Sequence, residues 1–111
     1  MDARQENWSH FRKRHPEVEA TYQAFARAVH EEGGPLSARE RALVKVGVSA
    51  ASQFDYALRY HIAQARRAGC SPADIEHAIL LTATTAGFPR MMAAFMIMSR
   101  ELAKTRKQGH R

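Results

Sequence analysis

Residues 53–69 read QFDYALRYHIAQARRAG, and this stretch decides the fold class of the 111-residue chain. Its apolar residues recur with the period of an α-helix, which predicts one helix from about Gln53 to Ala68. Within it Phe54, Ala57 and His61 are spaced i, i+3 and i+7, so their side chains should share one face. The stretch therefore predicts a helix that carries a histidine on a defined face.

Four more helix patterns flank this segment, two on each side. Pro16 is placed to open the first, and Ser37 with Glu40 forms a capping-box pattern at the start of the second. Ser71 is the expected N-cap of the fourth, and Pro89 lies at the break before the last. No run of alternating β-branched residues and no Asn-Gly or Asp-Gly turn occurs. We expect an all-α chain of about five helices.

The length suits one domain with a modest core, and we assign residues 1–111 to a single domain. The net charge is +6, but much of it lies near the two ends. We expect the basic ends, residues 1–15 and 105–111, to be mobile. Because these charges do not form a stripe along a recognition helix, the charge pattern disfavours nucleic-acid binding.

The longest apolar run, Met91–Met98, is far shorter than the roughly 20 residues that a membrane span needs. The first residues lack the apolar segment of a signal peptide. The one cysteine, Cys70, cannot form an internal disulfide, which fits a reducing compartment. We expect a cytoplasmic protein with no membrane segment, in which Cys70 is a packing residue.

The run Met91–Met98 is apolar almost all round the predicted last helix. A helix in a small domain buries one face in its own core, and a second apolar face needs a further partner. Methionine also packs well in irregular interfaces. We expect this helix to lie at a contact between subunits of a homo-oligomer; the alternative is that it is the central helix of the bundle.

Three stretches together resemble the carboxymuconolactone decarboxylase and AhpD-like family, over roughly residues 36–98. Leu36–Val44 begins Leu-Ser-Ala-Arg-Glu-Arg, Tyr60–Ile75 ends Ala-Gly-Cys-Ser-Pro-Ala-Asp-Ile, and Thr82–Pro89 ends Ala-Gly-Phe-Pro. The resemblance implies an all-α, AhpD-like helical bundle with a central helix-turn-helix pair, assembled as a homotrimer or homohexamer. It also implies the family's label of alkylhydroperoxidase or peroxiredoxin activity.

The family's thiol peroxidases carry Cys-x-x-Cys followed four residues later by His, with a glutamate on the preceding helix. Mapped onto this chain, the two cysteine positions fall on Phe54 and Ala57. The glutamate position falls on Ala42, and only the histidine is kept, as His61. Because the nucleophilic thiol and its resolving partner are both replaced, we disfavour a cysteine-based peroxidase mechanism.

The decarboxylase branch of the family needs no cysteine, and the resemblance to it implies another chemistry. Decarboxylation of a lactone acid requires a cation for the substrate carboxylate and a proton donor for the resulting carbanion. Arg41 is the candidate carboxylate clamp, with Arg39 as a second choice, and His61 is the candidate acid/base. The expected pocket residues are Phe54, Ala57 and Tyr60.

Three interpretations stay open at this point. The chain is a small-molecule enzyme or binder of the decarboxylase type, a degenerate oligomeric module in which Phe54 fills the pocket, or a residual peroxidase. We expect no metal site, because no cluster has ligand spacing and His77 lies on a different predicted helix from His61. We expect no cofactor either.

Overall fold

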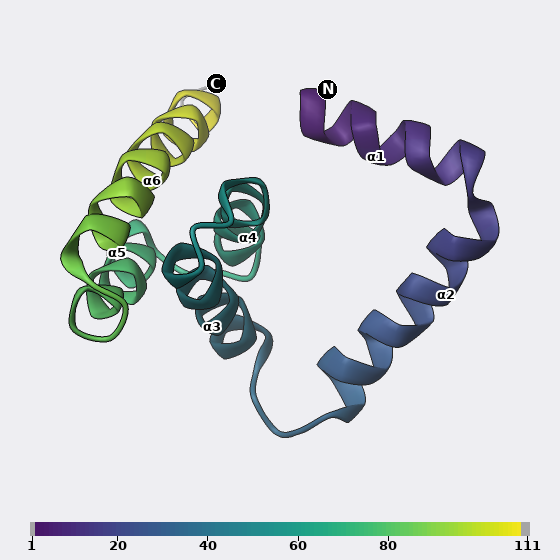
Figure 1. Ribbon diagram of the computed structural model, residues 1–111, viewed down its shortest axis with the longest axis horizontal. Coiled ribbons are helices and arrows are strands. Elements are labelled where there is room, and N and C mark those ends of the chain that lie inside the picture. The colour runs from purple at the N-terminus through teal and green to yellow at the C-terminus, as the bar shows by residue number, and fades with distance from the viewer. Residues whose placement is uncertain (1, 110–111) are drawn as a thin grey trace. The chain divides into compact units, whose positions relative to one another are not determined.

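The computed structural model describes residues 2–109, with side chains described for residues 2–104, and every regular element in this range is helical. The α-helices are α1 (Ala3–Arg14), α2 (Pro16–Arg27), α3 (Ala38–Ala51), α4 (Asp55–Arg67), α5 (Pro72–Leu80) and α6 (Phe88–Gly109). The π-helical segment η1 (Ala28–Glu32) continues α2, and the 3-10 segment η2 (Leu81–Thr84) follows α5 (Figure 1). The prediction of an all-α chain is confirmed for these residues.

Helix α1 is the element that the sequence pattern did not predict. It begins with a capping box, in which the Gln5 backbone N–H donates to Asp2 and the Asp2 N–H donates to the Gln5 side chain, at 2.8 and 2.9 Å. The helix buries no side chain, so it lacks the apolar periodicity on which helix prediction depends. The expected mobility of residues 1–15 stays a prediction, and the side chains of residues 105–111 lie outside the described part of the chain.

The helices group into two compact units, Met1–Pro35 and Leu36–Arg111. The assignment of residues 1–111 to one domain stays a prediction. Within the first unit, α1 contacts α2 through Trp8, whose ring forms a T-shaped pair with the Tyr22 ring at a centroid distance of 6.2 Å. None of the described residues 2–35 is buried. The first unit therefore has no hydrophobic core of its own among these residues.

The second unit holds the hydrophobic core. Helix α3 contacts α4, α5 and α6, and α6 also contacts α4 and α5. The largest fully buried side chains are Leu58, Ile62, Ile75, Ile79, Val46 and Cys70. These apolar side chains come from α3, α4, α5 and the loop before α5, and buried side chains of α6 such as Ile97 join the same cluster. Burial of this cluster holds the four helices of the unit together.

The helix starts of this unit are set by local hydrogen bonds, as the sequence predicted. The Glu40 backbone N–H donates to Ser37 Oγ at 3.1 Å, and the Asp74 N–H donates to Ser71 Oγ at 3.0 Å. Each capping box is closed by the carboxylate in the third helical position, which accepts the backbone N–H of the serine. The predicted N-caps of α3 and α5 are confirmed.

The turn between α3 and α4 corrects the predicted start of the histidine helix. The helix begins at Asp55 rather than near Gln53, because Gln53 has a left-handed backbone with φ 56°. Phe54 is the N-cap residue, and its backbone N–H donates to the Ser49 carbonyl at 3.0 Å. Phe54 therefore precedes the helix, and only Ala57 and His61 lie within it.

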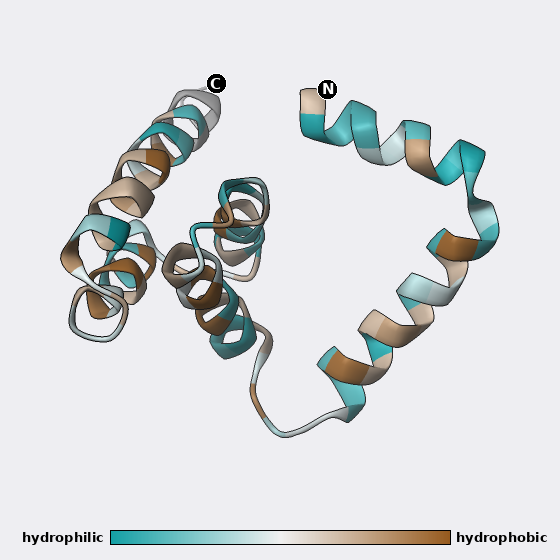
Figure 2. Ribbon diagram, in the orientation of Figure 1, coloured by the Kyte–Doolittle hydropathy of each residue, from teal (hydrophilic) through white to brown (hydrophobic). Residues whose placement is uncertain are grey.

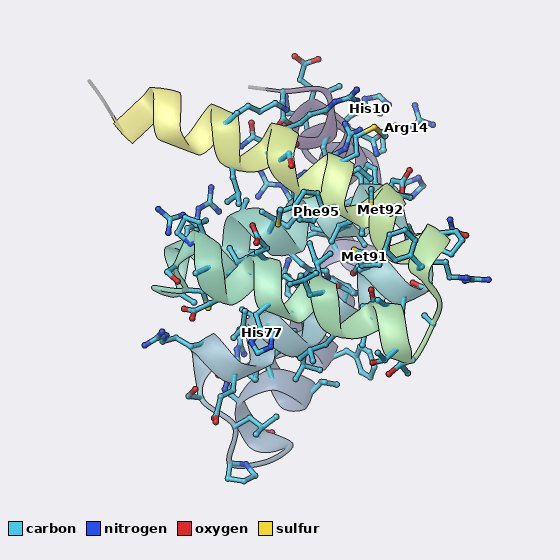
Figure 3. The ribbon with its side chains drawn as sticks, turned by 90° about the vertical axis from the view of Figure 1, so that its left-hand side faces the viewer. His10, Arg14, His77, Met91, Met92 and Phe95 are labelled. Carbon is cyan, nitrogen blue, oxygen red and sulfur yellow. The ribbon has the colours of Figure 1, made fainter. Side chains whose placement is uncertain are left out.

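The apolar run on α6 is divided between the core and the surface. Met91, Ala94, Ile97 and Met98 are buried, whereas Met92 and Met96 keep 47% and 51% of their surface exposed. Figure 3 shows Met91, Met92 and Phe95 along this helix. The helix is therefore not enclosed by its own unit. Among the described residues, no helix combines the length and apolar character needed to cross a membrane.

Candidate functional site

Helix α4 carries most of the predicted site residues, and its buried face fixes its position. Leu58, Ile62 and Ala65 lie in the core. His61 lies on a different face of α4 and is half-buried, as is Ala57 one turn before it. The imidazole of His61 and the ring of Tyr60 form a T-shaped pair, with a centroid distance of 5.2 Å. The histidine thus lies at the boundary between the core and the surface of the unit.

Phe54 does not pack into the interior of its own unit. The side chain is 58% exposed, and the residue stands at the N-cap of α4, before the turn that carries Ala57. The interpretation in which Phe54 fills a pocket beside His61 would need a ring packed against the helix. Tyr60, the remaining predicted pocket residue, is also exposed.

The two candidate clamp arginines differ in their surroundings. Arg41 is half-buried in the first turn of α3, and its Nη1 donates to the Leu36 carbonyl at 2.7 Å. A guanidinium has five N–H donors. The bond to Leu36 uses one of them, so other donors of Arg41 remain for a carboxylate. Arg39 is exposed and forms an ion pair with Asp74, with 3.2 Å between Nη2 and Oδ2. Arg39 is therefore engaged with the Asp74 side chain, whereas the bond of Arg41 goes to a backbone carbonyl.

Two further cationic side chains, Lys45 and Arg90, are candidates to hold a substrate carboxylate, and neither was predicted from the sequence. Lys45 is half-buried on α3, four residues after Arg41, so the two side chains are neighbours on that helix. Arg90 reaches from the start of α6 to the end of α3, where its Nη1 donates to the Ala51 carbonyl at 3.0 Å. The helical spacing of Lys45 from Arg41 is visible in the sequence, whereas the contact of Arg90 depends on the fold.

The carboxylates of the two capping boxes have lowered pKa values. The backbone N–H of Ser37 donates to Glu40, and this bond holds the Glu40 pKa below its ordinary value of 4.5. The backbone N–H of Ser71 likewise lowers the pKa of Asp74 below 3.8, with a smaller contribution from Arg39. Both carboxylates are therefore more acidic in the folded chain than in the unfolded chain.

These shifts predict a loss of stability in acid. A lowered folded-state pKa stabilises the fold above the ordinary pKa, and the contribution is lost as the pH falls through the folded value. We therefore expect a lower urea midpoint at about pH 3 than at about pH 6. The double variant Glu40→Gln and Asp74→Asn should show a smaller difference between the two conditions. An equal difference in both proteins would contradict this assignment.

Cys70 lies in the loop between α4 and α5 and is fully buried. Its Sγ is 3.7 Å from the Arg39 carbonyl oxygen, and its own carbonyl accepts a hydrogen bond from Arg66 Nη1 at 2.9 Å. This environment agrees with a packing residue, because a reactive thiol needs access to its substrate. Ala42, at the position of the peroxidase glutamate, is also buried.

Among the described residues, no three His, Cys, Asp or Glu side chains gather as metal ligands.

A family model described as "Carboxymuconolactone decarboxylase family" matches residues 16–99. The match extends beyond the motif-bearing residues 36–98 to include α2, and it contains the whole of α4. No curated protein and no solved structure matches the chain.

Proposed function

Because the chain belongs to the carboxymuconolactone decarboxylase family, we propose that it binds or transforms a small carboxylic acid without cysteine chemistry. The site would lie beside α4, with His61 as the acid/base. The observation that supports this most is the placement of His61. It is half-buried beside half-buried Ala57, while the bulky ring of Phe54 is mostly exposed. A small residue next to the imidazole leaves room for a ligand.

The proposed reaction is loss of CO2 from a lactone acid. The bond between the carboxyl carbon and the ring breaks, and its electron pair passes into the lactone as an enolate. Arg41 would hold the substrate carboxylate through paired N–H donors, with Lys45 adding positive charge one turn later. His61 in its protonated form would then deliver a proton to the carbanion, which completes the reaction.

The peroxidase interpretation has less support. A thiol peroxidase needs an accessible thiolate and a second cysteine to resolve the sulfenic acid. The chain has one cysteine, Cys70, and it is fully buried in the loop after α4. The positions that would carry the two cysteines are Phe54 and Ala57.

Histidine-ring NMR tests the proposed site with carboxymuconolactone as the probe. Saturating addition should shift the ring C–H resonances of His61, because the ligand carboxylate and its ring would lie against the imidazole. His77 is exposed on α5, is labelled in Figure 3, and serves as the internal control. A spectrum in which His61 does not move, or in which His77 moves equally, would contradict the proposal.

We also propose that copies of the chain associate through the exposed face of α6. Phe88, Met92 and Met96 are spaced four residues apart and stay exposed, so they form one apolar stripe on the helix. Exposed methionine and phenylalanine side chains in a row are typical of subunit contacts. The homotrimer or homohexamer that the family resemblance implies would use this contact. An inactive, degenerate module with the same association is the second candidate function.

A further inference from the structure

Sulfur-containing side chains are distributed unequally between the core and the surface. Side chains are described for residues 2–104, and this range holds Cys70 and four methionines, Met91, Met92, Met96 and Met98. Cys70, Met91 and Met98 are buried. Met92 and Met96 keep 47% and 51% of their surface exposed. Within the described range they are therefore the sulfur-containing side chains most accessible to a dissolved reagent.

Both exposed methionines belong to the apolar stripe of α6. Phe88, Met92 and Met96 follow one another at intervals of four residues, which places them on one face of the helix. In Figure 2 the middle turns of α6 are tan to brown, and hydrophilic colours follow toward its C-terminal end. This stripe is the proposed contact between copies of the chain. A chemical change at Met92 or Met96 therefore acts on that contact.

The thioether of methionine is the group on this stripe that an oxidant attacks. Its sulfur lone pair attacks one oxygen of a peroxide, the O–O bond breaks, and an S–O bond forms. The sulfur loses two electrons to the peroxide, whose second oxygen leaves as hydroxide, takes up the remaining proton and becomes water. The product, methionine sulfoxide, is polar, and methionine sulfoxide reductases convert it back to the thioether.

We infer that Met92 and Met96 form an oxidation-sensitive site that controls association through α6. The inference rests on the proposed α6 contact. A sulfoxide oxygen in an apolar contact loses its hydrogen bonds to water without gaining a partner, which raises the dissociation constant by about tenfold or more. In the associated state the contact covers both side chains, so the oxidant acts on the dissociated copy. Oxidation therefore shifts the equilibrium toward separate chains.

The residue type on this stripe adds to the argument. Leucine would supply a similar apolar surface with similar helix propensity, and exchanges between methionine and leucine usually cost little stability. A leucine stripe would thus support the same contact without responding to an oxidant. The thioethers are therefore what makes association through this face sensitive to oxidation.

Peptide mass spectrometry tests which methionines react. The native wild-type protein is treated briefly with hydrogen peroxide, and trypsin then releases residues 91–100 as one peptide that contains all four methionines. Fragment spectra should place oxygen at Met92 and Met96 before the buried Met91 and Met98. The two exposed positions should react more slowly at protein concentrations where the chains associate. Equal reaction at all four positions would contradict the site.

Light scattering tests the consequence for association. Peroxide treatment should lower the wild-type mass toward that of the single 12.5 kDa chain, and a methionine sulfoxide reductase should restore it. The double variant Met92→Leu and Met96→Leu should associate like the wild type and keep its mass after the same treatment. Because this variant retains Cys70 and the buried methionines, it is the matched control for oxidation elsewhere. Equal dissociation of the variant and the wild type on oxidation would overturn the inference.

The untreated proteins separate this inference from the contact on which it rests. A wild-type chain that is monomeric before treatment contradicts the α6 contact, and so does a Met96→Asp variant that associates like the wild type. Association that is lost in Met96→Asp but survives complete oxidation of Met92 and Met96 overturns the oxidation-sensitive site alone and leaves the contact in place.

Discussion

Replacing Leu58 by alanine should lower the free energy of unfolding by about 2–5 kcal/mol. The side chain is 1% exposed and lies on the buried face of α4, a helix that contacts both α3 and α6. Truncation removes apolar surface from the core and leaves a cavity, and both effects reduce stability. Because the same face orients α4, the variant should also loosen the placement of His61.

Urea unfolding of the wild type and Leu58→Ala measures this effect. The matched control is Arg59→Ala, which changes the next residue of the same helix but removes an exposed side chain. The control should change the free energy of unfolding by no more than about 0.5 kcal/mol. If Leu58→Ala cost no more than Arg59→Ala, the buried face assigned to α4 would be wrong.

Replacing His61 by asparagine should reduce decarboxylation of carboxymuconolactone by a factor of about 10² to 10⁴. Asparagine keeps a polar side chain at the position, but it cannot donate a proton as an acid. The loss should fall on kcat rather than on KM, because the substrate carboxylate would still be held by Arg41. An Arg41→Gln variant should show the complementary pattern, with a raised KM.

A folding defect would reduce activity without any catalytic role, so the stability of each variant must be measured alongside. The control is His77→Asn, which makes the same chemical change at an exposed position on α5. The control should keep the wild-type rate. An active His61→Asn protein with normal stability would remove the histidine from the proposed mechanism.

The starts of α3 and α5 could be predicted from the sequence because their signals are local. Ser37 and Ser71 lie three residues before Glu40 and Asp74, and each box forms within one turn. Helix α1 was missed because its capping pair lies at the very start of the chain and precedes no apolar stripe. Helix prediction by apolar period finds helices that bury a face, and α1 buries none.

Burial was harder to predict than helicity. The stripe of α2 that includes Val18 and Phe25 has the same apolar period whether a helix faces its own core or another copy of the chain. Only the fold shows that the N-terminal unit itself does not bury these side chains. The same is true of Met92 and Met96 on α6, which continue a run whose other members are buried.

The candidate site was predicted in part. His61 was predicted from its position in a helix that resembles the family's signature helix. Arg41 was predicted from the family-like stretch Leu36–Val44. The prediction that Phe54 lies within the histidine helix was wrong. Phe54 is the N-cap of α4, because the left-handed backbone of Gln53 keeps the helix from starting before Asp55. Arg90 was missed because its contact with Ala51 joins residues 39 positions apart, and sequence spacing carries no sign of it.

Decarboxylase turnover of three proteins, measured as CO2 released from carboxymuconolactone, tests the central claim most directly. The wild type and Cys70→Ser should turn over equally, because the buried Sγ of Cys70 takes no part in the reaction. His61→Asn should lose nearly all turnover. Turnover that disappears in Cys70→Ser but survives in His61→Asn would contradict the account and assign the chemistry to the thiol.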